Sequence, residues 1–244
     1  MSVNDSNTGQ ERNMWYFENV NLFSIFCPHK FADYREDHQF KNFNKGEFIY
    51  FSDDPSSSIY LIVEGKVKIL YYTEEGNEVT KSVLTKGDVL GELSLLGEEK
   101  RKDYAQVVQE NTLVCQLTID QMQLLMKENL NFAFKINKLI GLRIRKLERR
   151  VESLVFKDVR TRMIEFIREF AEDKGEKDGQ GYRINHFLTH KDMADLIGTT
   201  RQTVTTLLNE LRNEGKIDFA RRSMFVPDIN SLSSGRHLSA SSNK

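Results

Sequence analysis

The chain has 244 residues, of which 39% are apolar and 29% charged, and 35 Lys and Arg residues face 36 Asp and Glu residues. This length allows one large or two modest domains, and no apolar run reaches the roughly 18–20 residues that cross a bilayer. The N-terminus lacks the apolar stretch of a secretory signal, and two cysteines exclude both a disulfide framework and a four-cysteine iron–sulfur cluster. We therefore expect a reduced, cytoplasmic, globular protein with no membrane partner.

A near-zero net charge does not exclude a nucleic-acid partner, because the basic residues are clustered. The stretch from Arg143 to Arg150 and the Arg221-Arg222 pair are basic, whereas acidic residues gather in other segments. Duplex binding depends on a local basic surface, not on the sum over the chain.

Short strands separated by turns are predicted from about residue 45 to 118. The predicted strands 60–63, 66–72 and 78–84 are separated by turn residues at 64–65 and 74–77. In the second run Val67, Ile69 and Tyr71 alternate with Lys66, Lys68 and Leu70, which predicts a half-buried strand. Further glycines at 46, 87, 91 and 97 give the even spacing of an antiparallel roll or jelly roll.

A helical pattern replaces the strands from about residue 119 and continues, with a break near Asn129, to about Leu154. Its second part has an apolar seam at heptad spacing, flanked by Arg, Lys and Glu. The seam consists of Asn137, Ile140, Ile144, Leu147, Val151 and Leu154. We expect a dimerisation helix; the alternative is an ordinary amphipathic helix that lies on the β-domain.

A second helix is predicted after Asp158, which is placed to cap it. Its apolar face is formed by Val159, Met163, Phe166, Ile167 and Phe170. The charged, glycine-rich stretch 172–182 predicts a surface loop, and the serine-rich tail 231–244 predicts disorder.

Residues 187–226 carry the strongest pattern in the chain. Thr189 can cap a first short helix, Gly198 can form a tight turn, and Thr200 can cap a second helix that ends near Gly215. The second helix buries Val204, Leu207, Leu208 and Leu211 at helical spacing. Two short strands at 216–219 and 223–226 follow, so the segment predicts a winged helix-turn-helix.

The side chains left outside this motif suit DNA. An arginine can form a fork onto guanine O6 and N7, and hydroxyls and lysines near helix N-termini suit phosphate oxygens. The candidate base-reading residues are Arg201, Gln202, Thr205 and Thr206, and the candidate phosphate contacts are Thr189, Lys191, Thr200, Thr203, Arg221 and Arg222. The alternative is a helical hairpin with a purely structural role.

The run from Thr189 to Val204, T-x-x-D-M-A-x-x-I-G-T-T-R-Q-T-V, closely resembles the recognition segment of the Crp/Fnr superfamily. The resemblance covers roughly residues 20 to 230. It implies an α+β fold with an effector β-roll at 20–125, a dimerisation helix and hinge at 126–156 and a winged helix-turn-helix at 157–230. It also implies a homodimeric transcription regulator that contacts RNA polymerase and reads half-sites about 34 Å apart. Relatives commonly carry Glu and Arg where this chain has Gln202 and Thr206, so the preferred half-site is expected to differ.

The β-domain resembles a cyclic-nucleotide-binding roll, most clearly at Gly91, Glu92 and Leu93. In nucleotide-binding relatives the Gly-Glu pair holds the ribose, and a following Arg-Ser pair holds the cyclic phosphate. An ungapped alignment places Lys102 and Asp103 at the Arg-Ser positions, whereas a shift by one residue offers Arg101. The hydroxyls that contact adenine in the cAMP-responsive relative are replaced here by Leu147 and Glu148. The resemblance thus leaves cAMP or another small-molecule effector open, without a preserved phosphate clamp.

Other functions find less support in the sequence. A nucleotide-sensing module that binds protein instead of DNA is the alternative from another class. The only candidate haem ligands near the β-domain are in Cys27-Pro28-His29, where a buried cysteine and a surface histidine are the better explanation. The five histidines are scattered without a paired nucleophile, so we expect no enzyme.

Overall fold

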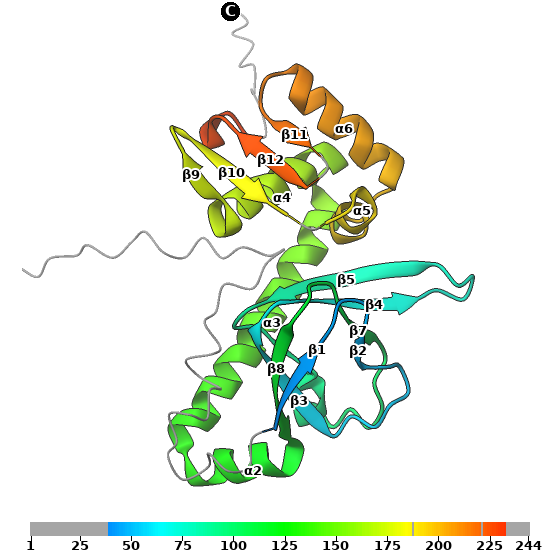
Figure 1. Cartoon of the computed structure of the whole chain (residues 1–244), viewed down its shortest axis with the longest axis vertical. Helices are drawn as coiled ribbons and strands as arrows, with labels where there is room; N and C mark the ends of the chain where they lie inside the picture. Colours follow the sequence, from blue (N-terminus) through cyan, green and yellow to red (C-terminus); the bar gives the residue numbers. More distant parts are fainter. Residues whose placement is uncertain (1–38, 187, 221, 233–244) are drawn as a thin grey trace, which may run out of the picture. The chain divides into compact units, whose positions relative to one another are not determined.

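The computed structural model describes residues 39–186, 188–220 and 222–232, and the chain divides into two compact units between Val151 and Glu152 (Figure 1). Cys27, His29, Arg221 and nearly all of the serine-rich tail lie outside the described residues. No helix in the described ranges is long and apolar enough to cross a membrane.

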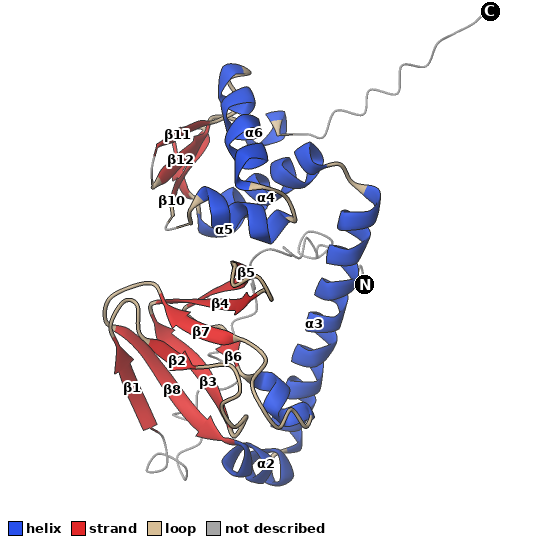
Figure 2. Cartoon of the chain, turned by 90° about the vertical axis from the view of Figure 1, so that its right-hand side faces the viewer, coloured by secondary structure: helices blue, strands red, loops and turns tan. Residues whose placement is uncertain are grey.

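The first unit is built on two four-stranded antiparallel sheets, as the strand pattern predicts (Figure 2). One sheet has the order β1 (Gln39–Phe43), β8 (Thr112–Thr118), β3 (Ser58–Glu64) and β6 (Val89–Leu90). The other has the order β2 (Phe48–Tyr50), β7 (Tyr104–Val107), β4 (Lys66–Tyr72) and β5 (Glu78–Thr85). The order in each sheet differs from the order in the chain, which is the connectivity of a roll and not of a simple meander.

Strand β3 separates two apolar cores because successive side chains of a strand point to opposite faces. Tyr60 and Ile62 join the core that also contains Val67 and other buried residues of the second sheet. Ile59 and Leu61 join the core that contains residues of helices α2 (Ile119–Glu128) and α3 (Leu130–Phe156). The roll thus has one face closed by the second sheet and the other by helices.

Strand β4 departs from the predicted alternation in its second half. Val67 and Ile69 are buried as expected, but Leu70 is fully buried and Tyr71 is exposed. The pairing with β5 shifts by one residue between Ile69 and Leu70. The extra residue at this shift is Lys81 of β5, and such a bulge disturbs the ladder locally. The prediction that Tyr71 is buried on the face of Val67 and Ile69 was wrong, since Tyr71 is exposed.

The first part of helix α3 packs on the roll, and its second part carries an exposed apolar seam. It begins after the predicted break at Asn129, and Phe132 and Ile136 are buried against the roll. Ile140 is partly buried there, whereas Asn137 is exposed. The remaining seam residues leave the roll and are 45–63% exposed: Ile144, Leu147, Val151 and Leu154.

The second unit contains three helices and a small antiparallel sheet. The helices are α4 (Val159–Lys174), α5 (His190–Ile197) and α6 (Arg201–Asn213). The sheet has the order β11 (Asp218–Ala220), β12 (Ser223–Val226), β10 (Gly181–Asn185) and β9 (Glu176–Asp178). On α4, the predicted apolar residues Met163, Phe166, Ile167 and Phe170 are all buried.

The predicted surface loop at 172–182 is wrong. Helix α4 continues to Lys174, and β9 and β10 then pair, with Asp178 opposite Gly181. Gly179 takes a positive φ of 62° in the turn between them, a conformation that glycine adopts without steric cost. The charged side chains of β9 are exposed on an edge strand, where polar composition does not prevent pairing.

The first helix of the second unit depends on its predicted cap, since Asp158 accepts hydrogen bonds from Thr161 N (2.8 Å) and Thr161 Oγ1 (3.0 Å). We predict that Asp158→Ala lowers the free energy of unfolding by about 1 kcal/mol at neutral pH, measured by urea denaturation. The bond to the Thr161 amide holds the pKa of Asp158 below its ordinary value. Its stabilisation is therefore present above pH 4 and lost as the pH falls through the lowered pKa. A difference between the two proteins that persists undiminished in strong acid would contradict this account.

Candidate DNA-binding interface and effector pocket

Helices α5 and α6 each begin at a capping threonine, and a glycine forms the turn between them. Thr189 Oγ1 accepts from Asp192 N at 3.1 Å, and the Asp192 carboxylate accepts from Thr189 N at 2.7 Å. Gly198 ends α5 at φ 68°, and Thr200 Oγ1 accepts from Thr203 N at 3.1 Å to start α6. The predicted caps and the predicted glycine turn are confirmed.

Helix α6 has two faces of different chemistry. Its buried face consists of Val204, Leu207, Leu208 and Leu211, all 8% exposed or less, as the spacing predicts. Arg201, Gln202 and Thr206 are exposed, and Thr205 is half-buried. The first two turns of α6 therefore present polar side chains and no acidic residue.

The candidate phosphate contacts differ in their exposure and in their polar partners. Thr200 and Arg222 are exposed, as is Thr189. Thr203 is half-buried, with its hydroxyl 2.9 Å from the Thr200 hydroxyl. Lys191 is exposed but forms an ion pair with Asp195 (2.6 Å) on the same helix. The Asp195 side chain is only 10% exposed, so a phosphate contact from Lys191 has to compete with this ion pair.

The C-terminal hairpin is attached to the end of α6. The Arg212 guanidinium lies over the Phe219 ring at 3.7 Å, donates to the Phe219 carbonyl, and forms an ion pair with Asp218 (3.2 Å). These contacts join α6 to β11, the first strand of the predicted wing.

A buried arginine holds the turn to the start of α4. The Arg162 side chain donates from Nε to the Ile197 carbonyl (2.8 Å), from Nη1 to Lys157 (2.7 Å) and from Nη2 to Gly198 (3.1 Å). Leu154 lies close by, since a Cβ added to Gly198 would be 2.7 Å from its Cδ2. The seam residue Leu154 therefore also packs on the helix-turn-helix.

One residue beside α6 was missed by sequence reasoning. His190, the first residue of α5, has its Nδ1 2.9 Å from the Thr205 hydroxyl. Burial and the nearby Arg201 charge hold the pKa of His190 below its ordinary value. The sequence signal was weak, because a histidine after a helix cap does not show which helix its ring will contact.

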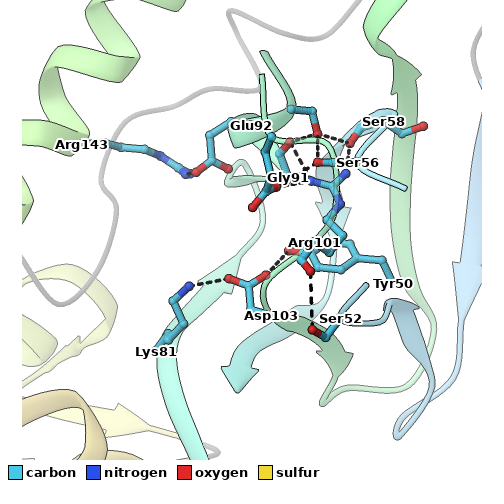
Figure 3. Close-up of polar contacts among 12 residues, drawn as sticks. Tyr50, Ser52, Ser56, Ser58, Lys81, Gly91, Glu92, Arg101, Asp103 and Arg143 are labelled. Carbon is cyan, nitrogen blue, oxygen red and sulfur yellow. Dashed lines mark hydrogen bonds and ion pairs between the residues drawn. The ribbon is translucent and has the colours of Figure 1, made fainter. Parts of the chain in front are cut away.

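In the first unit, Arg101 is the side chain that turns inward beside Gly91 (Figure 3). Its side chain is 2% exposed, donates to the carbonyl oxygens of Gly91 (3.1 Å) and Ser58, and lies 3.5 Å from Glu98. A Cβ added to Gly91 would be 2.9 Å from both terminal nitrogens. Gly91 also has a φ of +78°, so both the backbone conformation and the close guanidinium favour glycine at this position.

The ungapped alignment, which placed Lys102 and Asp103 at the clamp positions, is wrong about which residue turns inward. Asp103 accepts from the Tyr50 hydroxyl (3.2 Å) and from Lys81 (2.6 Å). Lys102 is exposed and lines an open hollow of about 260 Å³ with Tyr71, Tyr72 and Tyr104. The structure therefore agrees with the alignment shifted by one residue, which offers Arg101.

Glu92 and the other candidate effector residues are arranged differently from the expectation. The Glu92 carboxylate forms an ion pair with Arg143 of α3, and Arg143 also donates to the Val89 carbonyl (2.7 Å) (Figure 3). Leu93 in the short helix η3 (Glu92–Leu96) is 45% exposed, and Leu147 and Glu148 on α3 are exposed. Sequence reasoning did not assign Arg143 to this site, nor the hydroxyls of Ser56 and Ser94, which lie 2.7 Å apart near Arg101.

Tyr50 is buried next to Arg101. Its ring lies 4.6 Å below the Arg101 guanidinium, and burial together with Asp103 raises the pKa of its hydroxyl. The hydroxyl therefore stays protonated and acts as a donor to Asp103.

Models of known domain families match both halves of the chain. A cyclic nucleotide-binding domain model matches residues 40–129, and a Crp-like helix-turn-helix domain model matches residues 161–234. The chain is 32% identical to the global nitrogen regulator of Synechococcus elongatus, over 77% of this chain and 85% of that protein. It is 25% identical to the CRP-like cAMP-activated global transcriptional regulator of Mycobacterium tuberculosis, over 78% and 85%.

A solved structure of a CooA variant from Carboxydothermus hydrogenoformans has the same fold, with a TM-score of 0.73 and 24% identity over 89% of this chain and 96% of that chain. The chain belongs to the Crp/Fnr family of transcription regulators, as its recognition segment predicted. The named relatives are regulators and not enzymes.

Proposed function

We propose that the protein is a homodimeric regulator in which α6 of each copy reads one half of a near-palindromic DNA site. The observation that carries this proposal is the exposed Arg201, Gln202 and Thr206 face of α6, opposite a fully buried apolar face. An α-helix fits the major groove, and its N-terminal side chains reach base edges first.

Two residue types on this face fit particular bases. The Arg201 guanidinium suits guanine O6 and N7, and the Gln202 amide suits adenine N6 and N7. Thr189, Lys191, Thr200, Thr203, Arg221 and Arg222 would hold the phosphates on either side, which fixes register without reading sequence.

A protein-binding module without DNA contacts is the second candidate, but the charges on α6 favour DNA. The acidic residues Glu210 and Glu214 lie at the end of α6, where Arg160 pairs with both, at 3.0 and 2.5 Å. The first two turns of the helix carry no negative charge that would repel a phosphate backbone.

The second half of α3 supports a dimer. Ile144, Leu147 and Val151 are 53–63% exposed at heptad spacing, with charged residues on both sides. A second copy of the same helix would bury this stripe in a parallel coiled coil. Two reading helices would then address half-sites about 34 Å apart.

The site around Arg101 supports control by a small anionic effector. The guanidinium provides the positive charge, and the serine hydroxyls at 56 and 94 provide further hydrogen-bonding groups. An effector must replace the bonds from Arg101 to Gly91 and Ser58, because these now occupy the guanidinium. The resemblance to the family also implies RNA polymerase as the partner through which DNA binding acts.

The first test concerns base reading. Arg201→Ala should lower the preference for a duplex selected from a random pool over an unrelated duplex by about tenfold to a hundredfold. Arg168→Ala removes the same charge from α4, outside the reading helix, and is the control. Fluorescence anisotropy at several salt concentrations measures both. Unchanged preference in Arg201→Ala would contradict the assignment of α6.

A second test concerns the seam. Leu147→Asp should convert the dimer to monomers at micromolar concentration in sedimentation velocity, because it places a charge in the centre of the apolar stripe. Leu124→Asp makes the same change at an exposed leucine of α2, outside the seam, and should leave the dimer intact. If Leu147→Asp sediments like the unmodified protein, the seam is not the dimer interface.

The third test concerns the effector. Leu147 and Glu148 offer no hydroxyl to an adenine, so the base contacts of the cAMP-responsive relative are missing here. We therefore predict no calorimetric binding of cAMP at micromolar concentration, with cGMP as the parallel ligand. A micromolar Kd for cAMP that is lost in Arg101→Met would contradict this prediction and would show that Arg101 binds the cyclic phosphate.

A further inference from the structure

The Thr205 hydroxyl on the reading face is held from two sides. It donates to the Arg201 carbonyl at 3.0 Å, one helical turn back, and lies 2.9 Å from His190 Nδ1. A carbonyl oxygen can only accept, so the single hydroxyl hydrogen of Thr205 is used in that bond. Toward His190 the hydroxyl must therefore act as the acceptor.

This direction fixes the state of the histidine ring. His190 Nδ1 carries a hydrogen and donates it to Thr205, and in the neutral ring Nε2 is then bare. The lowered pKa of His190 favours the neutral ring at pH 7.

The histidine is itself held in place by the wing. Its ring makes an edge contact with Phe219, with centroids 6.1 Å apart, and the Arg212 guanidinium covers the same phenyl ring at 3.7 Å. The orientation of the Thr205 side chain thus depends on α5, α6 and β11 together.

A threonine with a committed hydroxyl hydrogen cannot donate to a base. It cannot address guanine O6, the N7 of either purine or thymine O4 through a hydrogen bond, because all of these are acceptors. The hydroxyl keeps one lone pair that could accept from adenine N6 or cytosine N4, but its two existing bonds direct it toward Arg201 and His190. The methyl group of the side chain makes no such bond, and thymine is the base that carries a methyl group in the major groove.

We infer that Thr205 reads a thymine through methyl–methyl contact, and that His190 is the positioning residue that holds the Thr205 hydroxyl away from the base. This inference rests on the proposed DNA-binding function. It names a base and a contact within each half-site that the reading helix addresses.

The experiment replaces each thymine of a selected duplex by deoxyuridine, which lacks only the methyl group. Replacing one particular thymine in each half-site should weaken binding of the whole chain to the duplex by about fourfold. This is the loss of affinity expected when one buried methyl-sized group is removed. Thr205→Val keeps a methyl group in a side chain of the same shape and should retain this sensitivity. Thr205→Ser keeps the hydroxyl and should bind both duplexes equally.

Variants at His190 separate the hydrogen bond from packing. His190→Asn can still donate from its amide at the position of Nδ1 but loses the ring contact with Phe219. It should retain the deoxyuridine sensitivity, whereas His190→Ala should reduce it toward that of Thr205→Ser. The ¹⁵N chemical shifts of the His190 ring in the free protein should report a hydrogen on Nδ1.

Three results would overturn the inference. The first is a sensitivity to deoxyuridine that persists in Thr205→Ser. The second is a loss of base preference in Thr205→Val at an adenine or cytosine instead of a thymine. The third is a His190 ring that carries its hydrogen on Nε2 alone. Failure of the unmodified protein to select any duplex would instead remove the proposed function, and the inference with it.

Discussion

The reading helix depends on one buried charge, the guanidinium of Arg162. A buried cation is tolerated only when its hydrogens are bonded, and here they meet the carbonyls of Lys157, Ile197 and Gly198. Two of these carbonyls belong to the end of α5 and its turn, and the third precedes α4. The hydrogen bonds of Arg162 therefore fix where α6 begins, and with it the positions of Arg201 and Gln202.

Arg101 in the β-roll is also buried and bonded to Gly91 and Ser58, but its Nε has no hydrogen-bond partner among the described residues. Under the proposed effector control, an effector has to bind the arrangement with Arg101 released more favourably than the one seen here, since a ligand shifts an equilibrium only by its differential affinity. Arg143, which joins Glu92 to α3, connects the same loop to the helix that carries the exposed apolar seam.

Much of this structure could be predicted because the decisive signals are local. The caps at Asp158, Thr189 and Thr200 and the left-handed Gly198 depend on neighbours within four residues, and the faces of α4 and α6 depend on helical period. The bulge between β4 and β5, the β9–β10 pairing and the inward turn of Arg101 depend on tertiary partners. Periodicity and an ungapped alignment contain no information on such partners. The contact between His190 and Thr205 was missed for this reason, because it requires the crossing of two helices.

The central claim, that two copies of α6 enter successive major grooves, is tested most directly by dimethyl sulfate protection on a selected duplex. The reagent methylates guanine N7, the atom that a forked arginine covers. The account predicts protected guanines in two tracts about ten base pairs apart on one face of the duplex. Protection in a single tract, or protection confined to the minor groove, would contradict it.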